Sequence, residues 1–383
     1  MKFDYLVIGA GISGAAAAFE LAQSGSVALI EAEAMPGYHS TGRSAALYTR
    51  NYGAPVVQRI NAASHDFFIN PPSGFAERPL VTPRGALTVA TPGDEDKLNA
   101  ILALSSEDNR IEAIPASRVL ELAPLLRPEC VSAAAYEPGV MDMDVDALHQ
   151  GYLRGLRQRG GSLFCNARID KVSRKSGLWR ASAGEACFEG RVVVNAAGAW
   201  ADQVGALAGT PPLGLVPKRR TAILVDEPRG LDTRTLPSVE FVDGEAYLKP
   251  DAGKIMASPG DQTPVEPQDI QPEEWDMAVL VDWLERRTLI SVRRIANSWA
   301  GLRTFAADGV PVAGFDPGIE DFFWLAGQGG FGIMMAPTLG RIAAGLITDG
   351  RIPWKIAAQG LSEQDLSVAR FSRRNAESTP LPA

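Results

Sequence analysis

The order of apolar and polar positions predicts a strand–helix–strand unit at the start of the chain. An apolar run of strand length covers residues 3–8, and an alanine-rich stretch of helical character covers about 12–24. A second apolar run, VALIE, closes the unit at Glu31. Strand-like and helix-like segments continue to alternate further along the chain. This alternation predicts an α/β fold.

Three glycines lie between the first apolar run and the helix, in the pattern G-x-G-x-x-G. Gly9 allows a tight turn, Gly11 lets backbone amides approach a pyrophosphate, and Gly14 lets helix and strand pack closely. Glu31, twenty residues after Gly11, is placed to accept hydrogen bonds from a ribose. We therefore predict dinucleotide binding; the alternative is a glycine-rich turn without a ligand. The contacts expected from this unit are Gly9, Gly11, Ile12, Ser13, Gly14 and Glu31.

Two later stretches favour FAD over NAD. Residues 191–202, RVVVNAAGAWAD, form an apolar run that ends in small residues, as does the strand behind the adenosine in FAD enzymes of the two-dinucleotide type. Residues 321–350 combine a strand, a glycine-rich loop and an amphipathic helix whose N-terminus would stabilise negative charge on a reduced flavin. Each stretch taken alone is equally a structural turn. The FAD contacts expected here are Ala197, Gly198, Gly329, Gly332 and Ile333.

The segments between these cofactor-binding stretches have a different character. They contain short strands such as GALTVAT, TAILVDE and AYLKPDAG, which predict a mixed or antiparallel sheet over the flavin. A substrate would then lie between two domains. The expected division is a discontinuous FAD-binding domain of 1–79, 145–212 and 300–365, a substrate domain of 80–144 and 213–299, and a C-terminal tail of 366–383.

Composition and charge exclude several classes of protein. The 383 residues are enough for two domains, and a net charge of -8 without a basic cluster argues against nucleic-acid binding. The three cysteines have no paired spacing, and the three histidines show no metal-ligand spacing. We find no signal peptide and no apolar run long enough for a membrane span. We expect a cytoplasmic protein, with a peripheral position at the inner membrane face as the alternative.

A longer motif resembles that of a known family. Residues 298–317, SWAGLRTFAADGVPVAGFDP, resemble the G-x-R-x-x-x-x-D-G-x-P-x-x-G signature of the FAD-dependent D-amino acid oxidase superfamily, which includes glycine and sarcosine oxidases. Within it the resemblance is strongest to bacterial D-arginine dehydrogenases. That narrower resemblance rests on PGYHSTGRSAA, ALHQGYLRG, VNAAGAWAD, LGLVPKRR, YLKPDAG and WAGLR.

The resemblance implies both a fold and an activity. The fold is the two-domain type of D-amino acid oxidase and glycine oxidase, with a Rossmann-like FAD domain and a mixed-sheet substrate domain. The activity is oxidative deamination of D-amino acids by a dehydrogenase, with hydride transfer from Cα to flavin N5. Because the cofactor carries the electrons, the protein has mainly to orient Cα and exclude water.

Arg303 is the main candidate for binding the substrate. It lies in WAGLRTF among apolar and aromatic residues, and a buried arginine needs an anionic partner. Its planar guanidinium suits a bidentate contact with a carboxylate. The resemblance implies this role; the alternative is an internal ion pair with an aspartate or glutamate.

Four further residues complete the expected substrate site. Arg220 ends the run PKRR, which by itself is typical of a solvated turn, but the resemblance moves it to the substrate carboxylate. Tyr247 is either a core tyrosine or, by the resemblance, a support for that carboxylate. We expect Tyr52 to cap the pocket and the carbonyl of Gly330 to accept a hydrogen bond from the substrate amine.

The stretch GYHSTGRSAALYTRNYG, residues 37–53, is expected to serve both cofactor and substrate. Residues 37–46 should lie along the flavin, and 47–53 should turn out over the substrate. His39 lies where some relatives attach flavin covalently, but the similarity to D-arginine dehydrogenases implies non-covalent FAD. The cofactor contacts expected from this stretch are Arg43, Ser44 and Ala45.

Two positions depart from the D-arginine dehydrogenase pattern. Those enzymes carry a histidine where this chain has Leu47, and a glutamate that pairs with a cationic side chain where it has Ala86. A buried guanidinium or ammonium without its carboxylate is unfavourable by several kcal/mol. We therefore expect an apolar, uncharged side-chain pocket and a preference for neutral or hydrophobic D-amino acids.

Two alternatives of other classes remain open at this point. The same carboxylate anchors would serve oxidation of a 2-hydroxy acid or an N-alkyl amino acid. The chain would also suit one subunit of a larger amine-oxidising complex. The expected partners are a small amino acid and an electron acceptor, and the sequence leaves quinone and O2 equally open.

Overall fold

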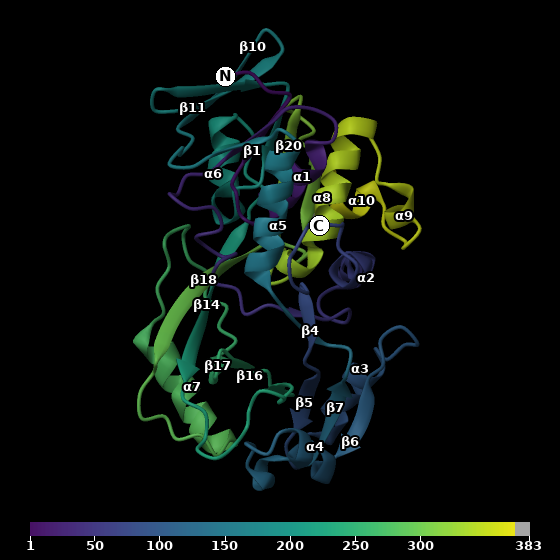
Figure 1. The fold of residues 1–383 in the computed structure, drawn as a ribbon, viewed down its shortest axis with the longest axis vertical. Helices are drawn as coiled ribbons and strands as arrows, with labels where there is room; N and C mark the ends of the chain where they lie inside the picture. The colour runs from purple at the N-terminus through teal and green to yellow at the C-terminus, as the bar shows by residue number, and fades with distance from the viewer. Residues whose placement is uncertain (372–383) are drawn as a thin grey trace, which may run out of the picture.

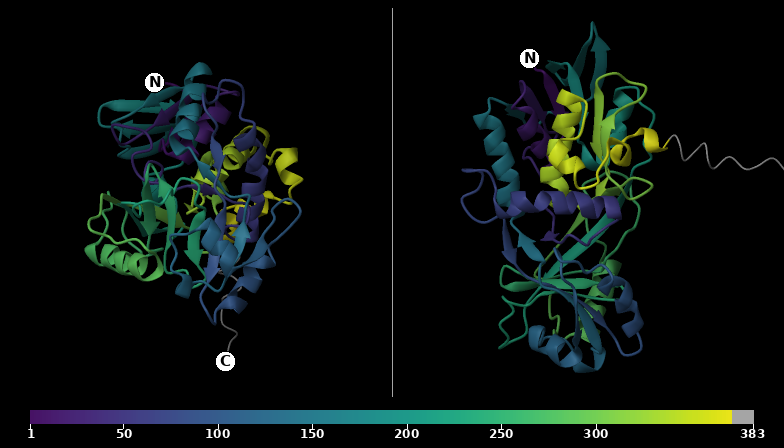
Figure 2. Two further views of the ribbon diagram at one scale, coloured as in Figure 1. Left: turned by 60° about the horizontal axis from the view of Figure 1, so that its bottom comes forward. Right: turned by 90° about the vertical axis from the view of Figure 1, so that its right-hand side faces the viewer.

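The computed structural model describes residues 1–371 and has two halves stacked along its long axis (Figure 1). The upper half in that view holds the N-terminal strand and the long C-terminal helix, and the lower half holds a second sheet. Segments from the beginning, middle and end of the chain all return to the upper half. The side view shows the same division, with helix α2 (Pro55–Ile69) lying across the waist (Figure 2).

A six-stranded sheet forms the centre of the upper half. Its strand order is β19-β20-β13-β1-β2-β9, and all neighbours are parallel except β19 and β20. β1, β2 and β20 are near-continuous apolar runs, which suit strands covered on both faces. The bounds are β1 Tyr5–Ile8, β2 Val27–Ile30, β9 Ser162–Phe164, β13 Val192–Asn195, β19 Val312–Phe315 and β20 Phe322–Ala326.

Helices cover this sheet, and small residues let them approach one another closely. α1 packs against α8 and α5, and its alanines are fully buried. A Cβ at Gly340 of α8 would lie 3.0 Å from Ala16 of α1, so a larger side chain would force the two helices apart. The bounds are α1 Ile12–Leu21, α5 Val145–Gln158, α6 Ala201–Leu207, α8 Gly332–Asp349, α9 Trp354–Ala357 and α10 Glu363–Leu366.

A nine-stranded mixed sheet forms the lower half, in the order β21-β18-β14-β17-β16-β15-β5-β7-β6. Only β15 and β5 are parallel neighbours. The long strands β14 and β18 reach upward to the cofactor half (Figure 1). The bounds are β5 Ala86–Ala90, β6 Glu112–Pro115, β7 Ala133–Glu137, β14 Val216–Val225, β15 Ser238–Phe241, β16 Tyr247–Asp251, β17 Lys254–Ser258, β18 Asn297–Phe305 and β21 Gln328–Gly329.

The two faces of the nine-stranded sheet have different surroundings. One face packs with helices around a core that contains Leu87, Val239 and Leu248. Because side chains alternate along a strand, the residues next to these point to the opposite face, and Tyr247 is one of them. That face is the one that meets the cavity described below. The helices of the lower half are α3 Leu98–Leu102, α4 Ala116–Leu122 and α7 Glu274–Arg287.

Two three-stranded sheets complete the strands of residues 1–371. One is a β-meander at the top of the molecule, and the other joins the two halves (Figure 1). The meander comprises β10 Lys171–Lys175, β11 Leu178–Ala183 and β12 Ala186–Gly190. The joining sheet comprises β3 Leu47–Tyr48, β8 Met141–Met143 and β4 Val81–Pro83.

The chain end differs from the sequence-based expectation. The expected C-terminal tail begins at 366, and in the structure Leu366 and Val368 of this segment are buried. Arg370 is ion-paired with Asp308 at 2.9 Å. Burial of apolar side chains and this ion pair hold the chain to residue 371, and the rest of the expected tail, 372–383, lies outside the described residues.

Candidate active site

Backbone geometry explains two glycines of the first βα turn. Gly9 has a φ of +99°, in the left-handed region, and a Cβ there would lie 2.5 Å from the carbonyl oxygen of Ala196. A Cβ at Gly14 would lie 1.9 Å from the carbonyl oxygen of Gly9. No side chain fits at either position. The turn therefore leads into α1 with its backbone exposed to the adjoining cavity.

Glu31 is buried at the end of β2, where backbone amides hold its carboxylate. Oε2 accepts a hydrogen bond from the amide of Ala10 at 2.8 Å, and Oε1 accepts one from the amide of Glu33 at 3.0 Å. Glu31 also lines the cavity. An ionised carboxylate has further lone pairs to offer, so its geometry suits the expected contact with a ribose.

A cavity of about 310 Å³ takes its walls from both halves of the molecule. They come from the ends of β1, β2 and β13 on one side and from β14, β16 and β18 on the other. Most of the sequence-predicted site residues meet here. Those lining the cavity are Gly9, Gly11, Ile12, Ser13, Glu31, Arg43, Ser44, Ala45, Ala197, Gly198, Arg220, Tyr247, Arg303, Gly329, Gly330, Gly332 and Ile333.

The glycine-rich segment before α8 fits a flat, polar ring system. The Nε2 atom of Gln328 is buried and has no hydrogen-bond partner among the described residues. Gly329, with a φ of +55°, leaves bare backbone beside it. Helix α8 begins at Gly332, and no side chain caps its first amides. A free amide donor and an uncapped helix N-terminus suit the polar edge of an isoalloxazine, so the residues present fit FAD.

Residues 37–46 are tied to both halves of the molecule. The hydroxyl of Thr41 accepts a hydrogen bond from the amide of Ile12 at 3.0 Å, which joins this loop to α1. The hydroxyl of Ser40 donates to the carbonyl of Leu302 at 2.6 Å, which joins it to β18. The loop therefore forms one wall of the cavity in a fixed position.

The Arg43 side chain contributes to this anchoring. Its guanidinium donates to the carbonyls of Ile270 and Ala300, both at 3.1 Å, and pairs with Asp269. That hydrogen bond lowers the pKa of Asp269. The indole of Trp299 in turn donates to the carbonyl of Arg43 at 3.0 Å. Because the Arg43 side chain is engaged with protein groups, we expect this part of the loop to contact the cofactor mainly through its backbone and through Ser44 and Ala45.

Arg303 presents an unpaired cation to the cavity. Its guanidinium lies against Gly330, where a Cβ would be 3.0 Å from Nη1. Within residues 1–371, no carboxylate or carbonyl hydrogen bonds or ion pairs with it. Burial and then the neighbouring charge of Arg303 lower the pKa of Arg220. Two adjacent guanidinium groups facing one cavity are stabilised by an anion placed between them.

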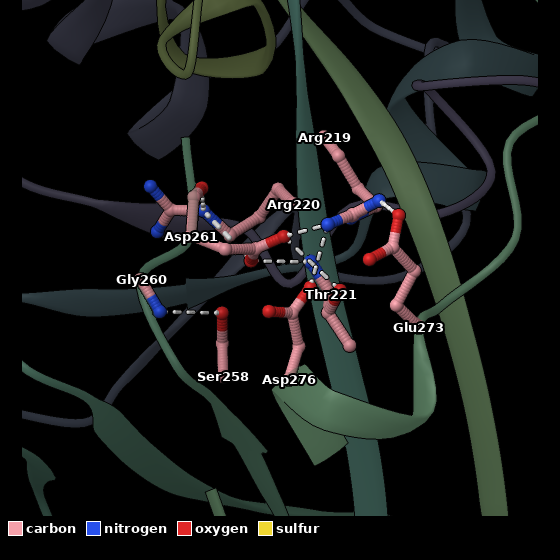
Figure 3. A network of polar contacts seen from close by, with 8 residues as sticks. All are labelled: Arg219, Arg220, Thr221, Ser258, Gly260, Asp261, Glu273 and Asp276. Atoms are coloured by element: carbon pink, nitrogen blue, oxygen red, sulfur yellow. Dashed lines mark hydrogen bonds and ion pairs between the residues drawn. The ribbon is translucent and has the colours of Figure 1, made fainter. Parts of the chain in front are cut away.

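The side chain of Arg220 is held by Asp261, which lies in the segment after β17. Its Nε donates to the carbonyl oxygen of Asp261 at 2.9 Å, as Figure 3 shows. The preceding Arg219 points to the opposite face of β14 and is only 4% exposed. There it forms a buried cluster with Asp261, Glu273 and Asp276. The basic run is therefore part of a strand, and the solvated-turn interpretation is wrong.

Of the two tyrosines expected at the site, one lines the cavity and the other lies outside its lining. Tyr247 lines the cavity from β16. Tyr52 does not line it; its ring packs edge-on against Phe331 at 4.9 Å and is 46% exposed. Tyr52 still lies close enough to Arg220 to interact with it electrostatically. This position, at the outer margin of the site, suits the expected capping role.

Comparison with known protein families gives the same assignment along almost the entire chain. Residues 4–346 match the family model described as FAD dependent oxidoreductase, DAO. The chain belongs to the DAO family. It is therefore an FAD-dependent oxidoreductase, and the predicted fold and cofactor are confirmed.

Several known proteins are similar to this chain along most of its length, at low sequence identity. Glycine oxidase of Geobacillus kaustophilus is 23% identical over 361 residues, which span 90% of this chain and 93% of that protein. Human dimethylglycine dehydrogenase is 24% identical, but the match spans 93% of this chain and only 43% of that protein. The structure of L-proline dehydrogenase from P. horikoshii superposes with a TM-score of 0.80 at 23% identity, covering 97% and 98% of the two chains.

Two predicted side-chain positions lie elsewhere than expected for a DAO-family substrate pocket. Leu47 and Ala86 do not line the cavity. Leu47 pairs with Asp142 in the joining sheet. Ala86 lies opposite Glu137 in the β5–β7 ladder, so the two share a face of the sheet. A neighbouring strand therefore supplies a carboxylate close to Ala86, which the sequence around Ala86 does not show.

Several cavity residues were missed by the sequence analysis. Trp200 lies against His39, with ring centres 4.5 Å apart, and Trp299 and Gln328 line the wall near Arg303. Trp299 and Gln328 belong to motifs already singled out, SWAGLR and AGQGGFG, so their position next to predicted site residues was a usable signal. In the part of the chain that the structure describes, no helix is long and apolar enough to cross a membrane.

Proposed function

We propose that this chain oxidises free amino acids at the Cα–N bond and acts on D-enantiomers. The observation that carries the proposal is the pair Arg303 and Arg220, two guanidinium groups at one cavity, of which Arg303 has no partner in residues 1–371. Such a pair is matched by a carboxylate bound in a bidentate way. DAO-family relatives named for glycine, dimethylglycine and L-proline also support an α-amino acid substrate.

The proposed roles follow from where the side chains lie. Arg303 and Arg220 bind the α-carboxylate, and Tyr247 donates a further hydrogen bond to it. The Gly330 carbonyl accepts from the substrate amine, so two points hold Cα in one orientation. FAD, held between the Gly9–Gly14 turn and the segment before α8, would supply the hydride acceptor. D-selectivity rests on the resemblance to D-arginine dehydrogenases, since it depends on which face of Cα this arrangement presents.

We propose that FAD is held without a covalent bond. His39 is the residue that would attach it, and its Nε2 lies 3.1 Å from Oε1 of Glu33. Its ring also packs against Trp200. A histidine engaged on two sides is poorly placed as a nucleophile. Following the resemblance, we further propose a dehydrogenase.

N-alkyl amino acids are the second candidate substrates. They carry the same α-carboxylate, and relatives named dimethylglycine dehydrogenase, sarcosine dehydrogenase and iminodiacetate oxidase support them. The carboxylate anchors serve a 2-hydroxy acid equally well. A role as one subunit of a larger amine-oxidising complex is the remaining alternative.

Anaerobic mixing of the FAD-loaded protein with single substrates separates these candidates. The panel comprises D- and L-forms of the same amino acids, sarcosine and a 2-hydroxy acid, and the readout is loss of flavin absorbance. We expect D-amino acids to bleach the flavin fastest. Faster bleaching by sarcosine, by L-forms or by the hydroxy acid would contradict the proposal. Bleaching by none of them would favour the complex-subunit alternative.

A further inference from the structure

One face of the nine-stranded sheet continues beyond the arginines and carries two carboxylates. Glu240 of β15 is the cross-strand partner of Tyr247, which lines the cavity. Its neighbour Val239 is in the core on the opposite face, so Glu240 lies on the same side of the sheet as Tyr247, beyond the residues that line the cavity. Glu137 of β7, the partner of Ala86, lies on the same side.

The two carboxylates have neutral partners only. The hydroxyl of Thr88 donates to Oε1 of Glu240 at 3.1 Å. Glu137 accepts from the hydroxyl of Thr49 at 2.6 Å and from Nδ2 of Asn109 at 3.1 Å. Among residues 1–371, no lysine, arginine or histidine pairs with either acid.

Protein groups around Glu240 disfavour its charged form, although the residue keeps contact with solvent. Burial, and next the charge of Glu137, raise the pKa of Glu240. Lys249 lies on the same side of β16 as Tyr247, but it pairs with Asp142 at 3.0 Å. The hydrogen bond from Thr49 brings the segment that follows β3 over this face. Glu240 thus remains accessible to solvent while protein surrounds it, which is an arrangement that favours a cationic ligand.

The distance from the arginines suits one extended molecule. β14 and β15 are three strand spacings apart, roughly 14 Å at about 4.8 Å for each spacing. Arg220 reaches across the first spacing, because a Cβ at Gly260 beyond the end of β17 would lie 4.0 Å from its Nη1. The Glu240 side chain shortens the gap from the other end. Less than two strand spacings then remain, under roughly 10 Å, which an amino acid with a long side chain ending in a charge can span.

We propose that Glu240 is a specificity-determining residue that binds the distal cationic group of an amino acid whose carboxylate lies at Arg303 and Arg220. The inference rests on the proposed function and replaces the preference for neutral side chains that the sequence alone led us to expect. β15 supplies the carboxylate that β5 lacks at Ala86. Substrates then carry a second ammonium or guanidinium group at the end of the side chain.

The test compares two substrates of equal length, lysine and norleucine, in the enantiomer that reduces the flavin. We expect the FAD-loaded protein to have the higher kcat/KM for lysine. Glu240→Gln should lower the lysine-to-norleucine ratio roughly 10- to 100-fold, since hydrogen bonds to charged groups contribute on this scale. Glu240→Asp should retain part of the preference. Glu245→Gln, an exposed acid in the neighbouring turn, should leave the ratio unchanged and serves as the matched control.

A pH series on the unaltered protein gives an independent readout. The titratable groups facing Glu240 are Glu137 and Tyr247, with Lys249 diagonal to it. Because the raised pKa belongs to an acid that binds the cation only when ionised, the lysine-to-norleucine ratio should fall as pH falls through that pKa. In Glu240→Gln the ratio should not change with pH.

The outcomes separate this inference from the proposed function. If lysine and norleucine both reduce the flavin but their ratio responds to neither Glu240→Gln nor pH, Glu240 has no role in specificity and the inference is overturned. If no amino acid reduces the flavin of any variant, the proposed function itself is wrong and the inference falls with it.

Discussion

Arg303 and Arg220 are held side by side at the cavity, although like charges repel. Arg220 is anchored through the carbonyl of Asp261, whereas the guanidinium of Arg303 lies against the backbone of Gly330 and has no hydrogen-bond or ion-pair partner in the described chain. This arrangement leaves the fork of Arg303 open for a ligand. At the scale of single residues, the site is therefore defined by one guanidinium that the fold itself does not satisfy.

Replacement of Arg303 by lysine tests this assignment. Lysine keeps the charge but loses the planar fork, so we expect kcat/KM for the preferred amino acid to fall at least 100-fold, about 3 kcal/mol. A simple carboxylate inhibitor should lose affinity in parallel. Lys218→Met is the control, because Lys218 is the ladder partner of Arg303 but does not line the cavity. Equal losses in both variants would contradict the assignment.

At the scale of elements, the alternation of side chains along strand β14 places two consecutive arginines on opposite faces of the sheet. Arg220 faces the cavity, and Arg219, one residue earlier, faces the segment 261–276 on the other side. Asp261 touches both, since its carbonyl accepts from Arg220 and its carboxylate lies 3.4 Å from Arg219. The buried cluster around Arg219 thus fixes the backbone that positions Arg220 (Figure 3).

Arg219→Met should destabilise the protein by roughly 3–5 kcal/mol. The reason is that it removes the cation paired with Asp276, which is 17% exposed, and leaves Asp261, only 7% exposed, with the more distant Arg220 at 3.8 Å as its ion-pair partner. Denaturant unfolding monitored by fluorescence measures this change. Arg286→Ala, which breaks an exposed pair with Asp282, should shift stability by less than about 1 kcal/mol. A small effect of Arg219→Met would show that solvent reaches the cluster.

At the scale of the whole molecule, the cofactor cavity lies between two sheets and is lined by both. Its walls combine the glycine turn of the six-stranded sheet with β14, β16 and β18 of the nine-stranded sheet. Residues 37–46 bridge the two, through Thr41 to α1 and through Ser40 to β18. A ligand filling this cavity contacts both halves and so stabilises their contact.

Removal of FAD should therefore lower the thermal unfolding midpoint. A ligand that binds only the folded state stabilises it by about 2.7 kcal/mol at a free concentration 100 times its Kd. Adding FAD back to the apoprotein should restore the midpoint, and FMN, which lacks the adenylate that reaches Glu31, should restore it only in part. The measurement is a melting curve followed by circular dichroism. A midpoint insensitive to FAD would contradict the inference that FAD fills a cavity lined by both halves.

The local features of the cofactor site were readable from the sequence because they depend on backbone sterics. A Cβ at Gly9 or Gly14 collides with backbone, so glycine is required there whatever surrounds the turn. The apolar runs that become β1, β2, β13 and β20 are short and bounded, which made the parallel sheet predictable. The signature around Arg303 then identified the family.

The substrate end was decided by tertiary structure. The sequence around Ala86 contains no acidic residue. Glu137 and Glu240 nevertheless reach the same face of the sheet, from strands about 50 and 150 residues further along the chain. The assignment of Arg219 to a buried cluster and Arg220 to the cavity likewise follows from strand pairing. Sequence by itself determined which backbone could bind FAD, because those constraints are local. Only the register between distant strands decided which charges meet the substrate, because neighbours across a sheet are not neighbours along the chain.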